Sequence, residues 1–125
     1  MTLVDDAVSI SEAAAQTGLS THALRYYERE GLMLGGVDRA SSSHRRYTPT
    51  DITWVVFLTK LRSTAMPIAR VREYVDLVRA GEESTPARLE LLLAHRANVI
   101  AQLDEITRSL AAIDYKIATY RKGKS

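Results

Sequence analysis

The sequence predicts a mainly α-helical fold: a helix-turn-helix unit with a small β wing, followed by a long C-terminal helix that forms a coiled coil. Three observations carry this prediction. Two short helical segments flank the turn TGLS at residues 17–20. A Gly- and Ser-rich stretch, residues 33–43, precedes the strand-like segment HRRY. Apolar residues then recur with alternating spacings of three and four from Leu89 to Tyr120.

Length and composition limit the possible classes. The 125 residues suffice for one domain, or one domain with an appendage. The absence of cysteine excludes a disulfide scaffold, a thiolate metal site and a thiol redox switch. The N-terminal residues have neither the basic region nor the apolar run of a signal peptide. No stretch approaches the roughly 20 apolar residues of a membrane span, so we expect a cytoplasmic protein with no membrane partner.

Helix-capping residues place the first two helices. Ser9, followed three residues later by Glu12, reads as a capping box that opens a short helix. Gly18 suits the left-handed residue that ends it. Ser20 then caps a second helix, which runs until Gly31. The alternative is an ordinary helical hairpin, because two helices joined by a turn are only weak evidence for a helix-turn-helix motif.

The second helix, THALRYYEREGL at residues 21–32, has a distinctive outer face. Four of its side chains fall at positions i, i+3, i+4 and i+7 and therefore share one side: His22, Arg25, Tyr26 and Arg29. Ala23, Leu24 and Tyr27 turn away from it. The shared face offers cations and a phenolic hydroxyl, which are groups that bind phosphate oxygens and base edges.

Residues 33–47 predict a small hairpin, or wing. Glycines and serines mark flexible turns, and HRRY is short enough for a single strand. This wing would carry Arg39, Arg45 and Arg46. A solvated loop with incidental arginines is the alternative.

Two further helices complete the first domain, residues 1–82. Thr48, Pro49 and Asp51 supply a hydroxyl cap, a proline at the first helical position and an acid in the first turn. Ile52, Val55, Val56 and Thr59 lie along one side of that third helix, with Trp54 and Leu58 adding bulk. A fourth helix over about 68–80 presents Ile68, Val71, Val75 and Val78 before Gly81.

The remaining segment, residues 83–120, predicts a dimerisation helix, and residues 121–125 form a short basic tail. From 87 to 120 the helix would be about 50 Å long, more than the roughly 25–30 Å width of a domain of this size. Its apolar row therefore needs cover from outside the chain, and a second copy across a two-fold axis supplies it. The predicted dimer interface comprises Leu92, Arg96, Val99, Leu103, Ile106, Leu110, Ile113 and Ile117. Arg96 interrupts the row and is interpreted as a register-setting or interchain pairing residue rather than a ligand site.

Charge distribution points to nucleic acid as the partner. The formal net charge of the whole chain is only +2. Between residues 20 and 65, however, seven basic residues stand against four acidic ones, a local excess of three positive charges. A dimer would present two copies of the cationic helix face, and its two-fold axis would match a palindromic duplex.

Three segments resemble the MerR family of bacterial transcription regulators: ISEAAAQTGLSTHALRYYEREGL, HRRYTPTDI and LRSTAMPIARVREYV. The match runs over about residues 9–80, and the final helix occupies the place of that family's dimerisation helix. The resemblance implies a winged helix-turn-helix DNA-binding domain joined to an antiparallel coiled-coil dimer. It also implies a recognition helix over 21–30.

The resemblance further implies which residues meet DNA. Together with the cationic face and the wing, it gives this predicted set: Thr21, His22, Arg25, Tyr26, Tyr27, Arg29, Arg45, Arg46 and Arg62. Tyr47 closes the wing and is open to a core or a contact role. The chain departs from the family at Ser43 and His44, where Gly-Tyr is usual, and at Gly35–Gly36, where proline is common.

Family members distort the DNA of an overlong promoter spacer, so the resemblance implies promoter DNA and RNA polymerase as partners. A small-molecule effector is unassigned. A pocket around Tyr74, Leu93 and Ala97 and plain core packing explain those residues equally well. We expect no cofactor, no metal site and no enzymatic activity, because nucleophile-base, phosphate-loop and metal-ligand patterns are missing. The alternative is an adaptor or antitoxin-like module that uses the coiled coil to bind a different chain.

Overall fold

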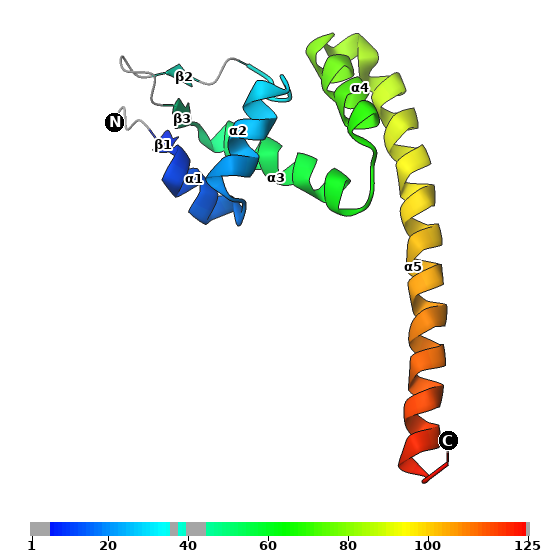
Figure 1. Ribbon diagram of the computed structural model, residues 1–125. Coiled ribbons are helices and arrows are strands. Elements are labelled where there is room, and N and C mark those ends of the chain that lie inside the picture. The colour runs from blue at the N-terminus through cyan, green and yellow to red at the C-terminus, as the bar shows by residue number, and fades with distance from the viewer. Residues whose placement is uncertain (1–5, 36–37, 40–44, 125) are drawn as a thin grey trace. The chain divides into compact units, whose positions relative to one another are not determined.

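The computed structural model describes residues 6–35, 38–39 and 45–124, and the chain divides into two compact units, Met1–Arg88 and Leu89–Ser125 (Figure 1). The mainly helical fold class is confirmed. The elements in chain order are β1 (Val8–Ser9), α1 (Ile10–Thr17), α2 (Thr21–Arg29), β2 (Asp38–Arg39), β3 (Arg45–Tyr47), α3 (Pro49–Ser63), α4 (Ile68–Arg79), the 3₁₀ turn η1 (Glu82–Ser84) and α5 (Thr85–Arg121). Among the described helices, none has both the length and the hydrophobicity that a bilayer crossing requires.

Ser9 and Ser20 are the N-caps of α1 and α2, as predicted, but of the capping box predicted at Ser9 the structure gives only the hydroxyl half. The Ser9 hydroxyl accepts a hydrogen bond from the Glu12 backbone N–H at 3.2 Å, and Ser20 accepts from Ala23 at 3.0 Å. Gly18 ends α1 with φ 77°, in the left-handed region that glycine adopts without the steric cost of a Cβ atom. A hydroxyl satisfies one free amide at each helix start, and the turn between the two helices is only three residues long, residues 18–20.

The end of α2 is closed by a Schellman motif. Gly31 adopts φ 71°, and its N–H donates to the Glu28 carbonyl at 3.1 Å. The Leu32 N–H donates to the Tyr27 carbonyl at 3.0 Å. This pair of bonds satisfies the last carbonyls of the helix and turns the chain sharply toward the wing.

The sheet has three strands in the order β1-β3-β2, all antiparallel. β2 and β3 pair Asp38 with Arg46 and Arg39 with Arg45, so the predicted wing hairpin is confirmed. β1, which sequence reasoning missed, pairs Val8 with Tyr47. A two-residue strand is too short to show periodicity, and Ser9 was assigned only as a cap. Ser43 and His44, the predicted departures at the wing tip, lie outside the described residues.

α3 opens with a complete capping box. The Thr48 hydroxyl accepts from the Asp51 N–H at 3.1 Å, while the Asp51 carboxylate accepts from the Thr48 N–H at 2.9 Å. Its end is unusual because Ala65 adopts φ 74°. The Ala65 N–H donates to Arg62 and the Met66 N–H to Leu61, which is a Schellman motif with alanine where glycine is favoured.

The core of the first unit forms where α1, α2, α3, α4 and the sheet converge. From α3 it takes Val55, Leu58 and Leu61, so the fully buried stripe is rotated slightly from the row predicted around Ile52 and Val56. The other buried hydrophobic side chains of this unit are Ala13, Leu24, Tyr27, Leu32, Met33, Tyr47, Met66, Val71 and Val75.

Two arginines of α4 fasten that helix to the end of α2. Arg72 pairs with the Glu30 carboxylate, and this hydrogen bond raises the pKa of the Arg72 guanidinium. Arg79 donates to the backbone carbonyl of Gly31 at 2.8 Å and to that of Met33. The turn after α2 is therefore held by donors from α4 as well as by its own backbone bonds.

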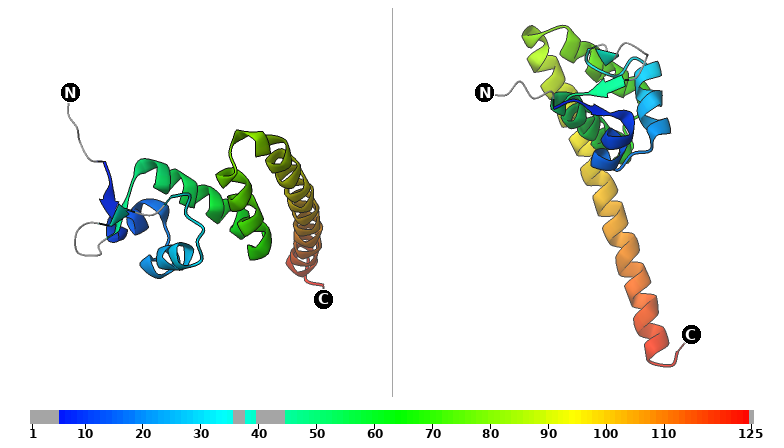
Figure 2. Two further views of the ribbon diagram at one scale, coloured as in Figure 1. Left: turned by 90° about the horizontal axis from the view of Figure 1, so that it is seen from above. Right: turned by 90° about the vertical axis from the view of Figure 1, so that its left-hand side faces the viewer.

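α5 is one uninterrupted helix of 37 residues, about 55 Å long (Figure 2). The predicted long C-terminal helix is confirmed, with observed bounds Thr85–Arg121. Leu91, which the predicted row omits, is the buried residue of this helix, at 5% exposure. Large apolar side chains from Leu103 to Ile117 are exposed, with Ile106 at 63%. A long apolar stripe thus lies uncovered along the second unit.

Candidate nucleic-acid interface

The outward face of α2 matches the prediction in which side chains it presents. His22, Arg25 and Arg29 are exposed, and Tyr26 lies beside them at 36% exposure. Leu24, on the opposite side of the same helix, is completely buried. Burial of that apolar side fixes the rotation of α2 about its axis, so the polar residues face solvent.

Arg25 and Arg29 have no counter-charge within the described residues. Neither guanidinium makes a hydrogen bond or ion pair there, in contrast to Arg72 and Arg79 of α4. Each therefore keeps five N–H donors for an external acceptor, in a planar arrangement that matches phosphate or the O6 and N7 atoms of guanine. The Ser20 cap adds the positive end of the α2 dipole at the start of the same face.

Tyr27 is placed differently from its α2 neighbours in the predicted set. Its side chain is 8% exposed, and its hydroxyl lies 3.4 Å from the Thr59 hydroxyl of α3. Thr59 uses its own proton toward the Val55 carbonyl at 2.8 Å, so Tyr27 is the donor between the two. The Tyr27 ring is thus a core residue that locks α2 onto α3, and a direct contact with DNA stays a prediction.

The wing and α3 hold the remaining predicted residues. Arg45 lies in β3, one residue before Arg46. The half-buried Arg46 side chain donates to the Ala7 carbonyl at 2.6 Å, which ties the N-terminal segment to the sheet. Arg62 is exposed near the end of α3, where its guanidinium donates to the Met66 carbonyl at 2.6 Å. Arg46 and Arg62 therefore have structural hydrogen bonds, while their contacts with DNA stay predictions.

Tyr47 has a clear position. Its side chain is 0% exposed, and within the described residues its buried hydroxyl has no hydrogen-bond partner. Of the two roles left open by the sequence, the core role is the one that the structure supports.

The predicted dimer residues all lie on α5. Leu103, Ile106, Leu110, Ile113 and Ile117 are exposed, each at 42% or more, and Arg96 is exposed within the same row. Leu92 and Val99 are partly covered. Their packing against a second copy stays a prediction, as does the boundary of the first domain at residue 82.

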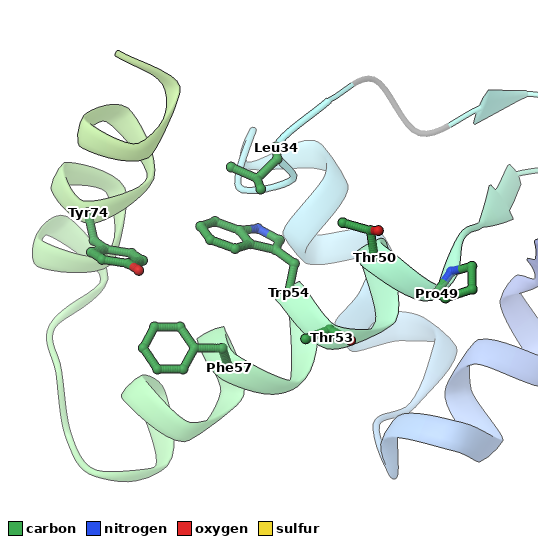
Figure 3. A pocket seen from close by; sticks show the side chains of 7 residues that line it. All are labelled: Leu34, Pro49, Thr50, Thr53, Trp54, Phe57 and Tyr74. Atoms are coloured by element: carbon green, nitrogen blue, oxygen red, sulfur yellow. The ribbon is translucent and has the colours of Figure 1, made fainter. Parts of the chain in front are cut away.

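An aromatic cleft on α3 and α4 was not found from the sequence. Trp54, which was interpreted as bulk for the core, lines it together with Phe57 and Tyr74 (Figure 3). The available signal was that the chain's single tryptophan and single phenylalanine lie one helical turn apart. Tyr74 was singled out as a pocket residue, but Leu93 and Ala97, proposed beside it, belong to the second unit. No cluster of three metal-ligating side chains occurs in the part of the chain that the structure describes.

Comparison with known proteins decides the family. The family model described as "MerR HTH family regulatory protein" matches residues 8–77, which is more than half of the chain. The chain belongs to the MerR family. The expected resemblance is thereby confirmed, and the matched range covers α1, α2, the wing, α3 and most of α4.

Relatives of this MerR-family chain are described as transcriptional regulators. An HTH-type transcriptional regulator of Haemophilus influenzae is 33% identical over 115 residues, which span 92% of this chain and 84% of the relative. The regulator AdhR of Bacillus subtilis is 36% identical over 93 residues, 74% of this chain and 66% of AdhR.

The similarity of this chain to one solved structure covers both units. That structure is HiNmlR, described as a MerR family regulator lacking the sensor domain, bound to promoter DNA. Its TM-score is 0.87 at 31% identity, over 93% of this chain and 87% of HiNmlR. A putative MerR family regulator from Listeria monocytogenes gives a TM-score of 0.83 at 32% identity, over 91% of this chain and 86% of that protein.

Proposed function

We propose that this chain binds a palindromic promoter operator as a homodimer and controls transcription by distorting the spacer DNA. The observation that carries the proposal is the outward face of α2, where Arg25 and Arg29 lack any counter-charge in the described chain. Because a helix fits the B-DNA major groove, this face can reach base edges and phosphates together. The promoter-bound form of the similar HiNmlR supports promoter DNA as the target.

The homodimer is proposed from the exposed row of α5. Five apolar side chains between Leu103 and Ile117 are open to solvent on one side of the helix. Soluble monomers rarely expose an apolar patch this long, whereas a two-fold pair of helices buries it completely. Antiparallel pairing follows the family, and it would hold two α2 helices at a fixed separation.

Distortion of the DNA is the finer part of the proposal. Bending a site of 20–30 base pairs by 40–90° costs of order 1–6 kcal/mol, which protein–backbone contacts on both sides of the bend must offset. The candidates for these contacts are Arg25 and Tyr26 on α2, Arg45 on β3 and Arg62 near the end of α3. The proposed partner at the promoter is RNA polymerase, because a distorted spacer would realign the promoter elements that the polymerase binds.

A salt titration tests the DNA-binding proposal. The operator is first obtained from a genome-wide footprint, and the dissociation constant of the purified protein is then measured between 50 and 200 mM salt. If the dimer neutralises 6–10 phosphates, affinity falls by about 10³–10⁵-fold over this range. A scrambled duplex of equal length serves as the control. Equal affinity for both duplexes, or affinity independent of salt, would contradict the proposal.

The second candidate function is a protein-interaction module. The same exposed row of α5 favours it, because that row could pair with a different chain. It leaves the free cations of α2 without a role. Sedimentation of the purified chain separates the two: a homodimer supports the regulator, and a monomer that assembles only with a foreign helix supports the adaptor.

A further inference from the structure

A cleft of about 500 Å³ opens on the first unit between α3 and α4 (Figure 3). Its lining comprises Leu34, Pro49, Thr50, Thr53, Trp54, Phe57 and Tyr74. The volume lies within the 300–1,000 Å³ of typical small-molecule sites, and no lining residue carries a charge. The cleft plays no part in the proposed DNA interface on α2.

The aromatic walls of the cleft are held in place. The Trp54 indole N–H donates to the Leu32 carbonyl at 2.8 Å, which fixes the plane of the ring. Tyr74 lies nearly parallel to it, with ring centroids 5.9 Å apart and an interplanar angle of 15°. Phe57 meets Tyr74 at 5.7 Å and 55°. Because α3 and α4 both contribute rings, the cleft exists before any ligand arrives, which lowers the entropic cost of binding.

Polar groups at the cleft are few and unused. Within the described residues, the hydroxyls of Thr50, Thr53 and Tyr74 make no hydrogen bond. In Figure 3 the Tyr74 hydroxyl is directed toward α3. Burial raises the pKa of Tyr74, so this phenol stays protonated and remains a donor. The nearby positive charge of Arg88 acts on Tyr74 in the opposite direction and would repel a cationic ligand.

We infer that this cleft binds an uncharged, planar molecule of two or three fused aromatic rings whose acceptor atom takes a hydrogen bond from the Tyr74 hydroxyl. Offset stacking on the faces of Trp54 and Tyr74 suits flat rings, and the absence of charged lining residues suits a neutral ligand. A single convergent donor is enough to fix the orientation of such a ligand. The inference does not depend on DNA binding.

The test is a titration of the full chain with quinoline, a neutral bicycle with one acceptor nitrogen, followed by ¹H–¹⁵N NMR. Trp54 is the only tryptophan, so the single indole N–H signal reports directly on the cleft. We expect a saturable shift of this signal together with those of Thr53 and Phe57. N-methylquinolinium is equally flat but lacks the acceptor atom and carries a positive charge that Arg88 repels, so it should bind about tenfold more weakly.

Variants of Tyr74 separate the ring from its hydroxyl. Tyr74→Phe keeps the ring and should lower the affinity for quinoline by about three- to tenfold, which is the range for the loss of one neutral hydrogen bond. Tyr74→Leu should weaken it further. Tyr115→Leu, which alters an exposed aromatic residue of α5, is the matched control and should bind quinoline like the parent chain.

Three results would overturn the inference. The first is an indole signal that does not saturate with quinoline. The second is equal affinity in the parent chain and in Tyr74→Phe with a preserved spectrum. The third is an indole signal that shifts with protein concentration and ignores quinoline, because it would mean that a second copy of the chain fills the cleft.

Discussion

The two units of this chain use apolar residues in opposite ways. Of the thirteen buried hydrophobic residues recorded among those described, twelve lie in Met1–Arg88 and one, Leu91, lies in Leu89–Ser125. Of the eleven large hydrophobic side chains that are exposed, ten lie in the second unit. The first unit folds its apolar stripes against one another, whereas the second repeats one stripe along a straight helix. The spacing of the apolar residues along the chain, rather than their number, therefore decides which unit buries its own apolar side chains.

The largest expected effect comes from placing a charge in the α5 row. Leu103→Asp would put two carboxylates into the proposed interface, one from each copy, and weaken dimerisation by at least about a thousandfold. Analytical ultracentrifugation measures this effect, while thermal unfolding of the first unit should hardly change. The matched control is Ala101→Asp, which lies off the row on the same helix. If Leu103→Asp still dimerised like the parent chain, the proposed dimer interface on α5 would be refuted.

The next largest effect is expected on operator binding by the outward face of α2. Arg25→Ala should weaken operator binding by about ten- to a hundredfold, since each lost guanidinium contact is worth about 1–3 kcal/mol. Fold should be retained, because Arg25 makes no contact that the core needs. Fluorescence anisotropy with labelled operator gives the affinity. Arg108→Ala on α5 removes an equal charge and should leave operator affinity nearly unchanged; a similar loss would mean that net charge alone drives binding.

A smaller effect tests the core of the first unit. Tyr47→Phe removes a buried hydroxyl that has no hydrogen-bond partner among the described residues, so the free energy of unfolding should rise by about 1 kcal/mol. Urea denaturation measures it. Tyr115→Phe makes the same chemical change at a residue 74% exposed and should be neutral. A destabilised Tyr47→Phe would show that the hydroxyl has a partner in solution.

The smallest effect lies at the turn between α3 and α4. Ala65→Gly should raise the free energy of unfolding by about 0.5–1 kcal/mol, since glycine relieves the left-handed conformation at φ 74° but costs entropy in the unfolded chain. Ala80→Gly, at a helix end with ordinary φ −71°, should instead lower it by a similar amount. Differential scanning calorimetry of both variants gives the comparison, and shifts of equal sign would contradict it.

The contrast between the units also explains how far sequence reasoning could go. Ser9, Ser20, Thr48 and Gly31 mark helix ends by local chemistry, so the helices of the first unit were placed accurately. The row of α5 is periodic over nearly its whole length, which made the second unit the easiest to predict.

What the sequence could not give depends on contacts between distant residues. β1 exists only because Val8 meets Tyr47, 39 positions later. The core position of Tyr27 requires Thr59 of α3, and the cleft requires Trp54 and Tyr74 from different helices. Local spacing placed Tyr26 on the outer face of α2 and turned Tyr27 away from it, but it did not show that the Tyr27 hydroxyl would meet Thr59 of α3.

The attachment of α2 to α4 has a consequence for how such regulators diversify. Arg79 binds main-chain oxygens of Gly31 and Met33, which every amino acid carries, rather than side chains of the preceding helix. Changes at Arg25 or Arg29 therefore leave this attachment intact, whereas a change at Glu30 would remove the carboxylate that pairs with Arg72. Under the proposed function, Arg25 and Arg29 could therefore be exchanged one at a time to alter base preference without rebuilding the scaffold.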